Sequence, residues 1–170
     1  MRKITTLSAA IFFVAAIGAF STLAHAGAAD DAEIKALEAR YSKAVEAKDI
    51  DALMANYVPG DSLVVFDIIP PRQYMGWDAY KKDWAGVIAG CADSPKLEVS
   101  NLAIESDRKL AFSHSIQHFA CTDSKGAKLE MTMRATDAYR KVNGKWLIVH
   151  EHLSAPIDLA TGKADLTSKP

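Results

Sequence analysis

Two long segments that alternate apolar and polar residues flank the dipeptide Asn143-Gly144 near the end of the chain. Asn and Gly tolerate the positive φ angles of a type I′ turn, so the pattern predicts a tight β-hairpin. With these residues as the loop, Asp137 lies opposite His150, and opposed residues share one face of a sheet. The expected face carries Asp137, Tyr139, Trp146, His150 and His152. A carboxylate beside an imidazole on this aromatic face predicts the floor of a pocket, and a shift of one residue would reverse the assignment.

A helical period dominates the earlier part of the chain. Three helices are expected, over about residues 31–47, 50–57 and 77–89. Asp30 or Asp31 is the expected N-cap of the first helix, and Asp49 is the expected N-cap of the second. The apolar side of the third helix is rich in aromatic residues.

Alternation replaces the helical period from Leu97 onward. The expected strands cover about residues 62–69, 73–75, 97–105 and 110–122, followed by the two strands of the hairpin. The last four strands form an antiparallel meander. Helices gathered on one side of an antiparallel sheet define an α+β domain, which we expect over residues 27–156, followed by a loosely held polar tail over residues 157–170.

Residues 1–26 have the pattern of a secretory signal peptide. Two basic residues precede an apolar segment, which ends in the small-residue motif Ala24-His25-Ala26. The alternative is a membrane anchor, but the uninterrupted apolar stretch is shorter than the roughly 20 residues that a span needs. We therefore expect a periplasmic or secreted protein that begins at Gly27 and has no further membrane segment.

The charge balance argues against a nucleic-acid partner. Removal of residues 1–26 would leave 18 basic and 21 acidic residues, and the basic residues are scattered. A surface that tracks phosphates needs clustered positive charge.

Cys91 and Cys121 are the two cysteines of the chain. An oxidising compartment permits a disulfide between them, and the alternative is two separate buried thiols. The sequence leaves both open.

Asp137 and His150 are the first chemical candidates, because a carboxylate can orient an imidazole and raise its basicity. The alternative is a buried structural pair. His114 is expected either to join the same pocket or to face solvent. A metal site built from His114, His118, His150 and His152 is a weaker alternative, because no compact ligand motif is present. We expect no metal.

Further candidates lie outside the hairpin. Asp67 follows an apolar strand and is either a base with a raised pKa or a carboxylate that begins a turn. Tyr57, Trp77 and Trp84 are expected either to line a ligand cavity with Tyr139 and His152 or to belong to the core. Motifs for covalent catalysis or nucleotide binding are missing from the sequence, so we expect proton transfer without a cofactor.

The segments ARYSKAVEAKDIDALMANY and NGKWLIVHEHLSAP resemble the nuclear transport factor two-like superfamily, and most closely its SnoaL-like and ketosteroid isomerase-like members. The resemblance covers about residues 31–156. It implies a cone, in which a curved sheet wraps around the helices and encloses a pocket. The isomerase pattern implies that Tyr41 donates to an oxyanion, that Asp67 is the base and that Asp137 is a protonated acid.

Three hypotheses follow for an exported, dimeric protein that binds a small apolar or carbonyl-containing molecule. The first is an isomerase-like or cyclase-like enzyme that moves a proton next to a carbonyl. The second is a ligand-binding protein without catalysis. The third is an assembly domain that uses the outer sheet face, where the predicted register places Leu147, Val149 and Leu153 together with Glu151.

Overall fold

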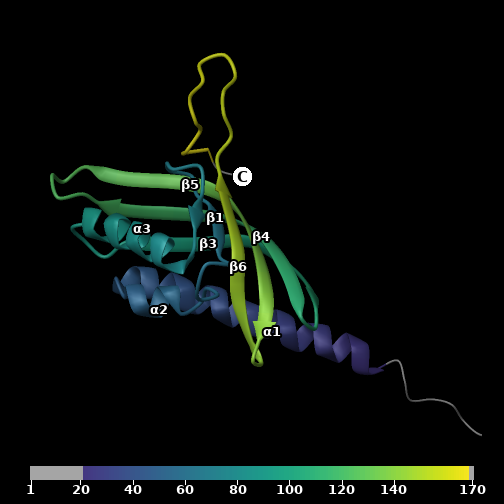
Figure 1. The fold of residues 1–170 in the computed structure, drawn as a ribbon. Helices are drawn as coiled ribbons and strands as arrows, with labels where there is room; N and C mark the ends of the chain where they lie inside the picture. Colours follow the sequence, from purple (N-terminus) through teal and green to yellow (C-terminus); the bar gives the residue numbers. More distant parts are fainter. Residues whose placement is uncertain (1–20, 169–170) are drawn as a thin grey trace, which may run out of the picture.

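The computed structural model describes residues 21–168, in which three helices lie on one side of a curved, six-stranded sheet (Figure 1). The helices are α1 (Ser21–Ala47), α2 (Ile50–Met54) and α3 (Trp77–Gly90). The strands are β1 (Val64–Phe66), β2 (Tyr74–Met75), β3 (Lys96–Asp107), β4 (Leu110–Thr122), β5 (Lys128–Val142) and β6 (Lys145–Ser154). The predicted α+β class and the cone-shaped, curved sheet are confirmed.

The strand order in the sheet is β2-β1-β6-β5-β4-β3. Strands β3 to β6 form the predicted antiparallel meander, and β1 adds to it in parallel with β6. The long strands β4 and β5 curve over the helices, so the sheet has a concave inner face and a convex outer face (Figure 1). The apolar core fills the space between the helices and the inner face.

Helix α1 begins earlier than predicted. Asp30 and Asp31 lie within it and do not cap it. The Asp30 side chain is buried, and its Oδ1 accepts hydrogen bonds from Lys141 Nζ at 2.7 Å and from Trp146 Nε1 at 3.2 Å. Asp30 therefore anchors α1 to the hairpin. Most of the predicted signal peptide, residues 1–20, lies outside the described residues, and no described helix is long and apolar enough to cross a membrane.

Helix α2 has the predicted N-cap but ends early. Asp49 Oδ1 accepts a hydrogen bond from Ala52 N at 2.9 Å. The helix stops at Met54 because the residues that follow it pair with β6. Ile148 N donates to Asn56 O at 2.9 Å, and Val58 N donates to Ile148 O at 2.8 Å. The segment 157–166 also returns to the sheet, where Thr132 N of β5 donates a hydrogen bond to Leu166 O at 2.7 Å.

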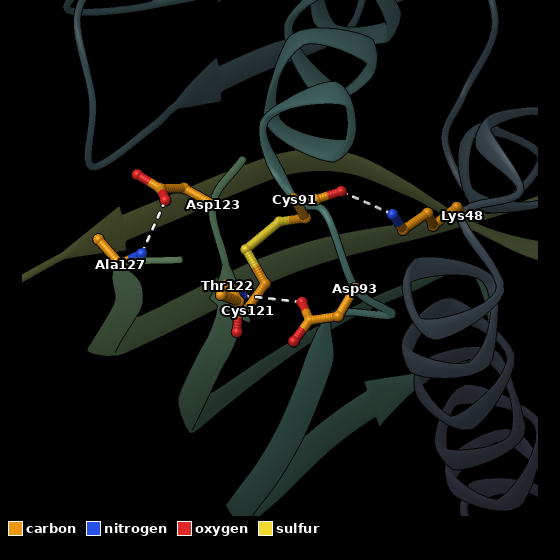
Figure 2. Close-up of a disulfide and its surroundings, with 7 residues drawn as sticks. All are labelled: Lys48, Cys91, Asp93, Cys121, Thr122, Asp123 and Ala127. Carbon is orange, nitrogen blue, oxygen red and sulfur yellow. Dashed lines mark hydrogen bonds between the residues drawn. A yellow bond between two sulfur atoms is a disulfide. The ribbon is translucent and has the colours of Figure 1, made fainter. Parts of the chain in front are cut away.

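Cys91 and Cys121 form a disulfide, which decides between the two alternatives left open by the sequence (Figure 2). Cys91 directly follows α3, and Cys121 lies near the end of β4, with a Cα–Cα distance of 5.7 Å. Beside it, Lys48 Nζ donates to Cys91 O at 2.6 Å and Thr122 N donates to Asp93 Oδ1 at 2.8 Å. The bond fixes the end of α3 over the inner face of the sheet.

Candidate functional site

The predicted hairpin forms, and a β-bulge changes its register beyond the turn. The predicted pairing holds as far as Tyr139 and Ile148. The next pair joins Ala138 to His150, so Val149 is the extra residue of the bulge. From this point to its end, β6 presents each side chain to the face opposite to the one predicted.

The predicted pair of Asp137 and His150 is therefore wrong. Asp137 lies opposite Glu151, and both side chains are buried on the inner face. The bulge moves His150 and His152 to the outer face and brings Glu151 and Leu153 inward. The predicted outer position of Glu151 and Leu153 is wrong for the same reason.

The histidines lie outside the inner cluster. His150 Nδ1 is 2.8 Å from Val64 O, and the ring of Phe66 lies edge-on to His150 and His152, with centroids 4.9 and 5.7 Å away. His114 and His152 are exposed. The described part of the chain contains no group of three or more His, Cys, Asp or Glu residues suited to a metal ion.

Buried carboxyls and tyrosines gather on the inner face. We call them the acid–tyrosine cluster, which consists of Glu38, Tyr41, Tyr57, Tyr80, Ser113, Asp137, Tyr139 and Glu151. Each is at most 4% exposed. Among the described residues, no lysine, arginine or histidine is buried. The carboxyls therefore lack a buried cation that would favour their ionised form.

Glu151 is held by two tyrosines. Tyr57 and Tyr80 donate hydrogen bonds to the same oxygen, Oε2, at 2.9 and 2.6 Å. Burial raises the pKa of Glu151 to about 7, against the lowering effect of the two hydrogen bonds, and the negative charges of Asp67 and Glu38 raise it further. Glu151 thus combines a fixed orientation with a pKa suited to a general base at neutral pH.

Asp137 lies between Glu151 and a second hydrogen-bonded group. Tyr139 donates to Glu38 Oε1 at 2.7 Å, and the Ser113 hydroxyl lies 2.8 Å from the Tyr139 hydroxyl. Burial, followed by the charges of Glu151 and Glu38, raises the pKa of Asp137 well above its usual range. Its Oδ1 has no hydrogen-bond partner among the described residues. Burial therefore favours the protonated form of Asp137, and one of its oxygens is uncommitted.

The structure brings several predicted residues together. The Tyr41 ring lies 6.0 Å from the Tyr57 ring and 5.9 Å from the Trp84 ring, and both are edge-on contacts. These residues join Asp137 and Tyr139 on the inner side of the cone. Burial raises the pKa of Tyr41 well above its usual range, so its hydroxyl is a donor at neutral pH.

Asp67 and Trp77 lie at the margin of the cluster. Burial raises the pKa of Asp67 to about 6, although its carboxylate accepts hydrogen bonds from the backbone N–H groups of the next two residues at 2.5 and 3.3 Å. Trp77 Nε1 donates to Met54 O at 2.9 Å and joins α3 to the end of α2. Asp67 stays a candidate, whereas Trp77 has a helix-packing role.

Glu38, Tyr80, Ser113 and Glu151 are the cluster members that sequence reasoning missed. Glu38 interrupts the apolar side of α1 one turn before Tyr41, which is a detectable signal. Tyr80 lies on the aromatic side of the third helix, where the helical spacing predicts only a core role. Glu151 carries no local signal, because its position depends on the bulge.

A surface groove of about 810 Å³ lies between α1, α2 and the hairpin turn. Alanines and exposed charged residues, including Arg40, Lys43 and Asp49, line it together with Trp146. None of the predicted catalytic residues reaches it. A pocket enclosed by the cone stays a prediction.

Comparisons with known proteins agree with this architecture. Residues 34–158 match the family model described as SnoaL-like domain. A nuclear transport factor 2-like protein of unknown function from Pseudomonas putida is 33% identical, with 84% of this chain and 98% of that chain covered and a TM-score of 0.75. The chain belongs to the SnoaL-like family. The family lies within the nuclear transport factor two-like superfamily, as the sequence predicted.

More distant solved structures share the family fold. A superfamily member from Salmonella enterica is 20% identical over 81% of this chain and 99% of that chain, with a TM-score of 0.70. A proposed scytalone dehydratase from Novosphingobium aromaticivorans is 21% identical over 76% and 86% of the two chains, with a TM-score of 0.69. No curated protein matches the chain.

Proposed function

We propose that the acid–tyrosine cluster binds a small, largely apolar carbonyl compound and moves a proton at the carbon next to the carbonyl group. The observation that carries this proposal is the direct opposition of Asp137 and Glu151 on a buried face, where no lysine, arginine or histidine of the described residues is buried. Environments that separate the pKa values of two neighbouring carboxyls are a way of assigning an acid and a base.

Glu151 is the base in this scheme. Tyr57 and Tyr80 donate to Oε2, so in this scheme Oε1 takes the proton. The carboxylate takes a proton from the carbon next to the carbonyl, and the electron pair moves to the carbonyl oxygen to form an enolate. Return of the proton to another carbon of the conjugated system gives an isomer, so the reaction needs no oxidant or cofactor.

Asp137 is the acid that stabilises the enolate oxygen. In this scheme Asp137 is protonated, a form that burial favours by raising its pKa, and its free oxygen donates a hydrogen bond where negative charge develops. Tyr41, which the isomerase resemblance implies as a donor, either donates a hydrogen bond to the same oxygen or packs against the ring of the ligand. Asp67, directly after β1, is an alternative base because its pKa is also raised, to about 6.

The test uses 1-tetralone, an apolar ketone with exchangeable hydrogens next to its carbonyl group. The protein is incubated with it in D₂O at pH 7.5, and deuterium uptake is followed by NMR. We expect Glu151→Gln to lose exchange by about 100-fold or more, since general base catalysis contributes roughly 10²–10⁴. Asp30→Asn is the control, because Asp30 is a buried carboxylate outside the cluster. Equal exchange by wild type and Glu151→Gln contradicts the proposal.

A ligand-binding protein without catalysis is the second candidate. The near-complete burial of the cluster favours it, since a tightly held ligand would be sequestered from water. It predicts a bound small molecule in native mass spectrometry of the purified protein, and no exchange of 1-tetralone hydrogens.

Export is also part of the proposal. The disulfide supports an oxidising compartment, and the signal-like pattern of residues 1–26 supports transport across a membrane. Mass spectrometry of the mature protein is expected to place its first residue at Gly27. A mature mass that retains residues 1–26 contradicts export by cleavage.

A further inference from the structure

Besides Asp137 Oδ1, three buried polar side-chain atoms on the inner side of the cone have no hydrogen-bond partner among the described residues. These atoms are Trp84 Nε1, Ser115 Oγ and Gln117 Nε2. The three residues are 7%, 4% and 2% exposed. Folded proteins pair the great majority of buried polar groups, so three unpaired atoms in one region require an explanation.

Two of these residues extend the row of polar side chains that begins at the acid–tyrosine cluster. Ser113, Ser115 and Gln117 are alternate residues of β4 and share its inner face. Ser113 pairs with Asp137, and Ser115 and Gln117 pair with the next inward-facing residues of β5. Successive inward positions are ~7 Å apart along a strand. The unpaired atoms therefore continue the site away from Asp137.

Trp84 lies on α3 and contacts two tyrosines of the acid–tyrosine cluster. Its ring lies 5.9 Å from the Tyr41 ring and 6.2 Å from the Tyr80 ring, so it faces the same interior as the cluster. The disulfide between Cys121 of β4 and Cys91 holds the end of α3 to this strand. Trp84 and Gln117 thus belong to two elements that are covalently tied together.

The chemistry of the unpaired atoms identifies their complement. An indole N–H donates only, and the amide Nε2 of glutamine also donates. We propose that Trp84 and Gln117, assisted by Ser115, bind a second oxygen of the ligand, at the end remote from the carbonyl that faces Asp137. The inference rests on the proposed function and defines its ligand class as an elongated apolar ketone with a hydrogen-bond-accepting oxygen at its far end.

Two matched compounds test the subsite. 6-Methoxy-1-tetralone carries an ether oxygen opposite its ketone, and 6-ethyl-1-tetralone has a methylene group in place of that oxygen. We expect wild type to bind the methoxy compound about tenfold more tightly, which corresponds to about 1.4 kcal/mol. Affinities are measured by titration calorimetry on the full chain with its disulfide intact.

Trp84→Phe and Gln117→Met remove the donors and leave an apolar side chain. We expect each to reduce the preference to within about twofold. Gln117→Met should leave the melting temperature of the ligand-free protein unchanged or higher, because an unpaired buried donor is removed. Trp84→Phe also removes part of a buried ring and should lower it. Trp77→Phe is the control, since Trp77 Nε1 is already bonded to Met54 O. It should keep the tenfold preference.

Several results overturn the inference: equal binding of both compounds by wild type, no binding of either, or an unchanged preference in Trp84→Phe and Gln117→Met. Deuterium exchange into 1-tetralone reports separately on proton transfer. A preserved preference without exchange overturns only the catalytic proposal, whereas exchange without a preference overturns only the second-oxygen subsite.

Discussion

The two faces of the central strands differ in the chemistry that they carry, although their residues alternate along the same chain. On β4, Ser113 and Gln117 face inward and are buried, whereas Phe112 and His114 face outward and are exposed. On β6, Glu151 faces inward while His150 and His152 face outward. The inner face has acids and tyrosines with raised pKa values, and the outer face has the histidines. Burial raises the pKa values of Glu151 and Asp137, so the candidates for proton transfer are carboxyls of the inner face.

Removal of the disulfide is expected to have the largest effect on stability, because it loosens the helix that covers the inner face. Cys91→Ala with Cys121→Ala frees a loop of about 30 residues, and the expected loss is roughly 3–4 kcal/mol of unfolding free energy. Urea unfolding of the double variant and wild type measures it. A loss below about 1 kcal/mol would show that α3 is held mainly by packing.

The second-largest expected effect is a pH dependence of stability that comes from Glu151 on the inner face. The pKa of Glu151 is about 7 in the folded protein and has an ordinary value of 4.5. The folded state therefore binds the proton of Glu151 more tightly than the unfolded state does. The stabilisation of the folded state by this proton is complete below pH about 4.5 and is lost as pH rises through about 7. The expected loss is on the order of 3 kcal/mol between these limits.

Glu151→Gln tests that assignment, since a neutral amide cannot titrate. Urea unfolding at pH 5, 6, 7 and 8 should show a fall in stability for wild type and a flatter profile for the variant. His152→Gln, on the outer face, is the matched control and should still show the fall in stability that Glu151 produces, because it leaves Glu151 and its tyrosine donors unchanged. Identical slopes for wild type and Glu151→Gln would remove Glu151 as the source.

The stability lost on removing a tyrosine hydroxyl from the cluster should depend on how many tyrosine donors its carboxyl partner keeps. Tyr139→Phe leaves the Glu38 carboxyl without its tyrosine donor, and we expect a loss of about 1–3 kcal/mol. Tyr57→Phe leaves Glu151 with Tyr80 as a donor, so the expected loss is smaller, about 0.5–1.5 kcal/mol. Thermal or urea unfolding compares the two variants, and the reverse order would contradict the ranking.

The local part of the fold could be predicted from the sequence, because its causes lie within a few residues. The period of the apolar side of α1, the Asp49 cap and the turn at Asn143-Gly144 are all local signals. The location of Tyr41 and Asp137 on the inner side followed from these patterns and the family resemblance.

The bulge could not be predicted in this way, since its partners are distant in the chain. Ile148 exchanges backbone hydrogen bonds with the segment after α2, and His150 then pairs with Val64 of β1. The extra residue Val149 lies between these two pairings and allows β6 to meet both neighbours. The register of the hairpin turn alone therefore predicts His150 on the inner face opposite Asp137, where the structure has Glu151.

Substitutions of exposed aromatic residues on the outer face should have the smallest effect on the unfolding free energy and the clearest effect on association. Phe66 and Phe112 are 38% and 50% exposed on it. The predicted homodimer stays a prediction, with these aromatic residues in place of Leu153 as its contact surface. Phe112→Lys should change the unfolding free energy of the monomer by no more than about 0.5 kcal/mol. Sedimentation at micromolar concentration should show a dimer for wild type and a monomer for the variant. A monomeric wild type would remove the assembly hypothesis and leave the inner face as the functional side of the sheet.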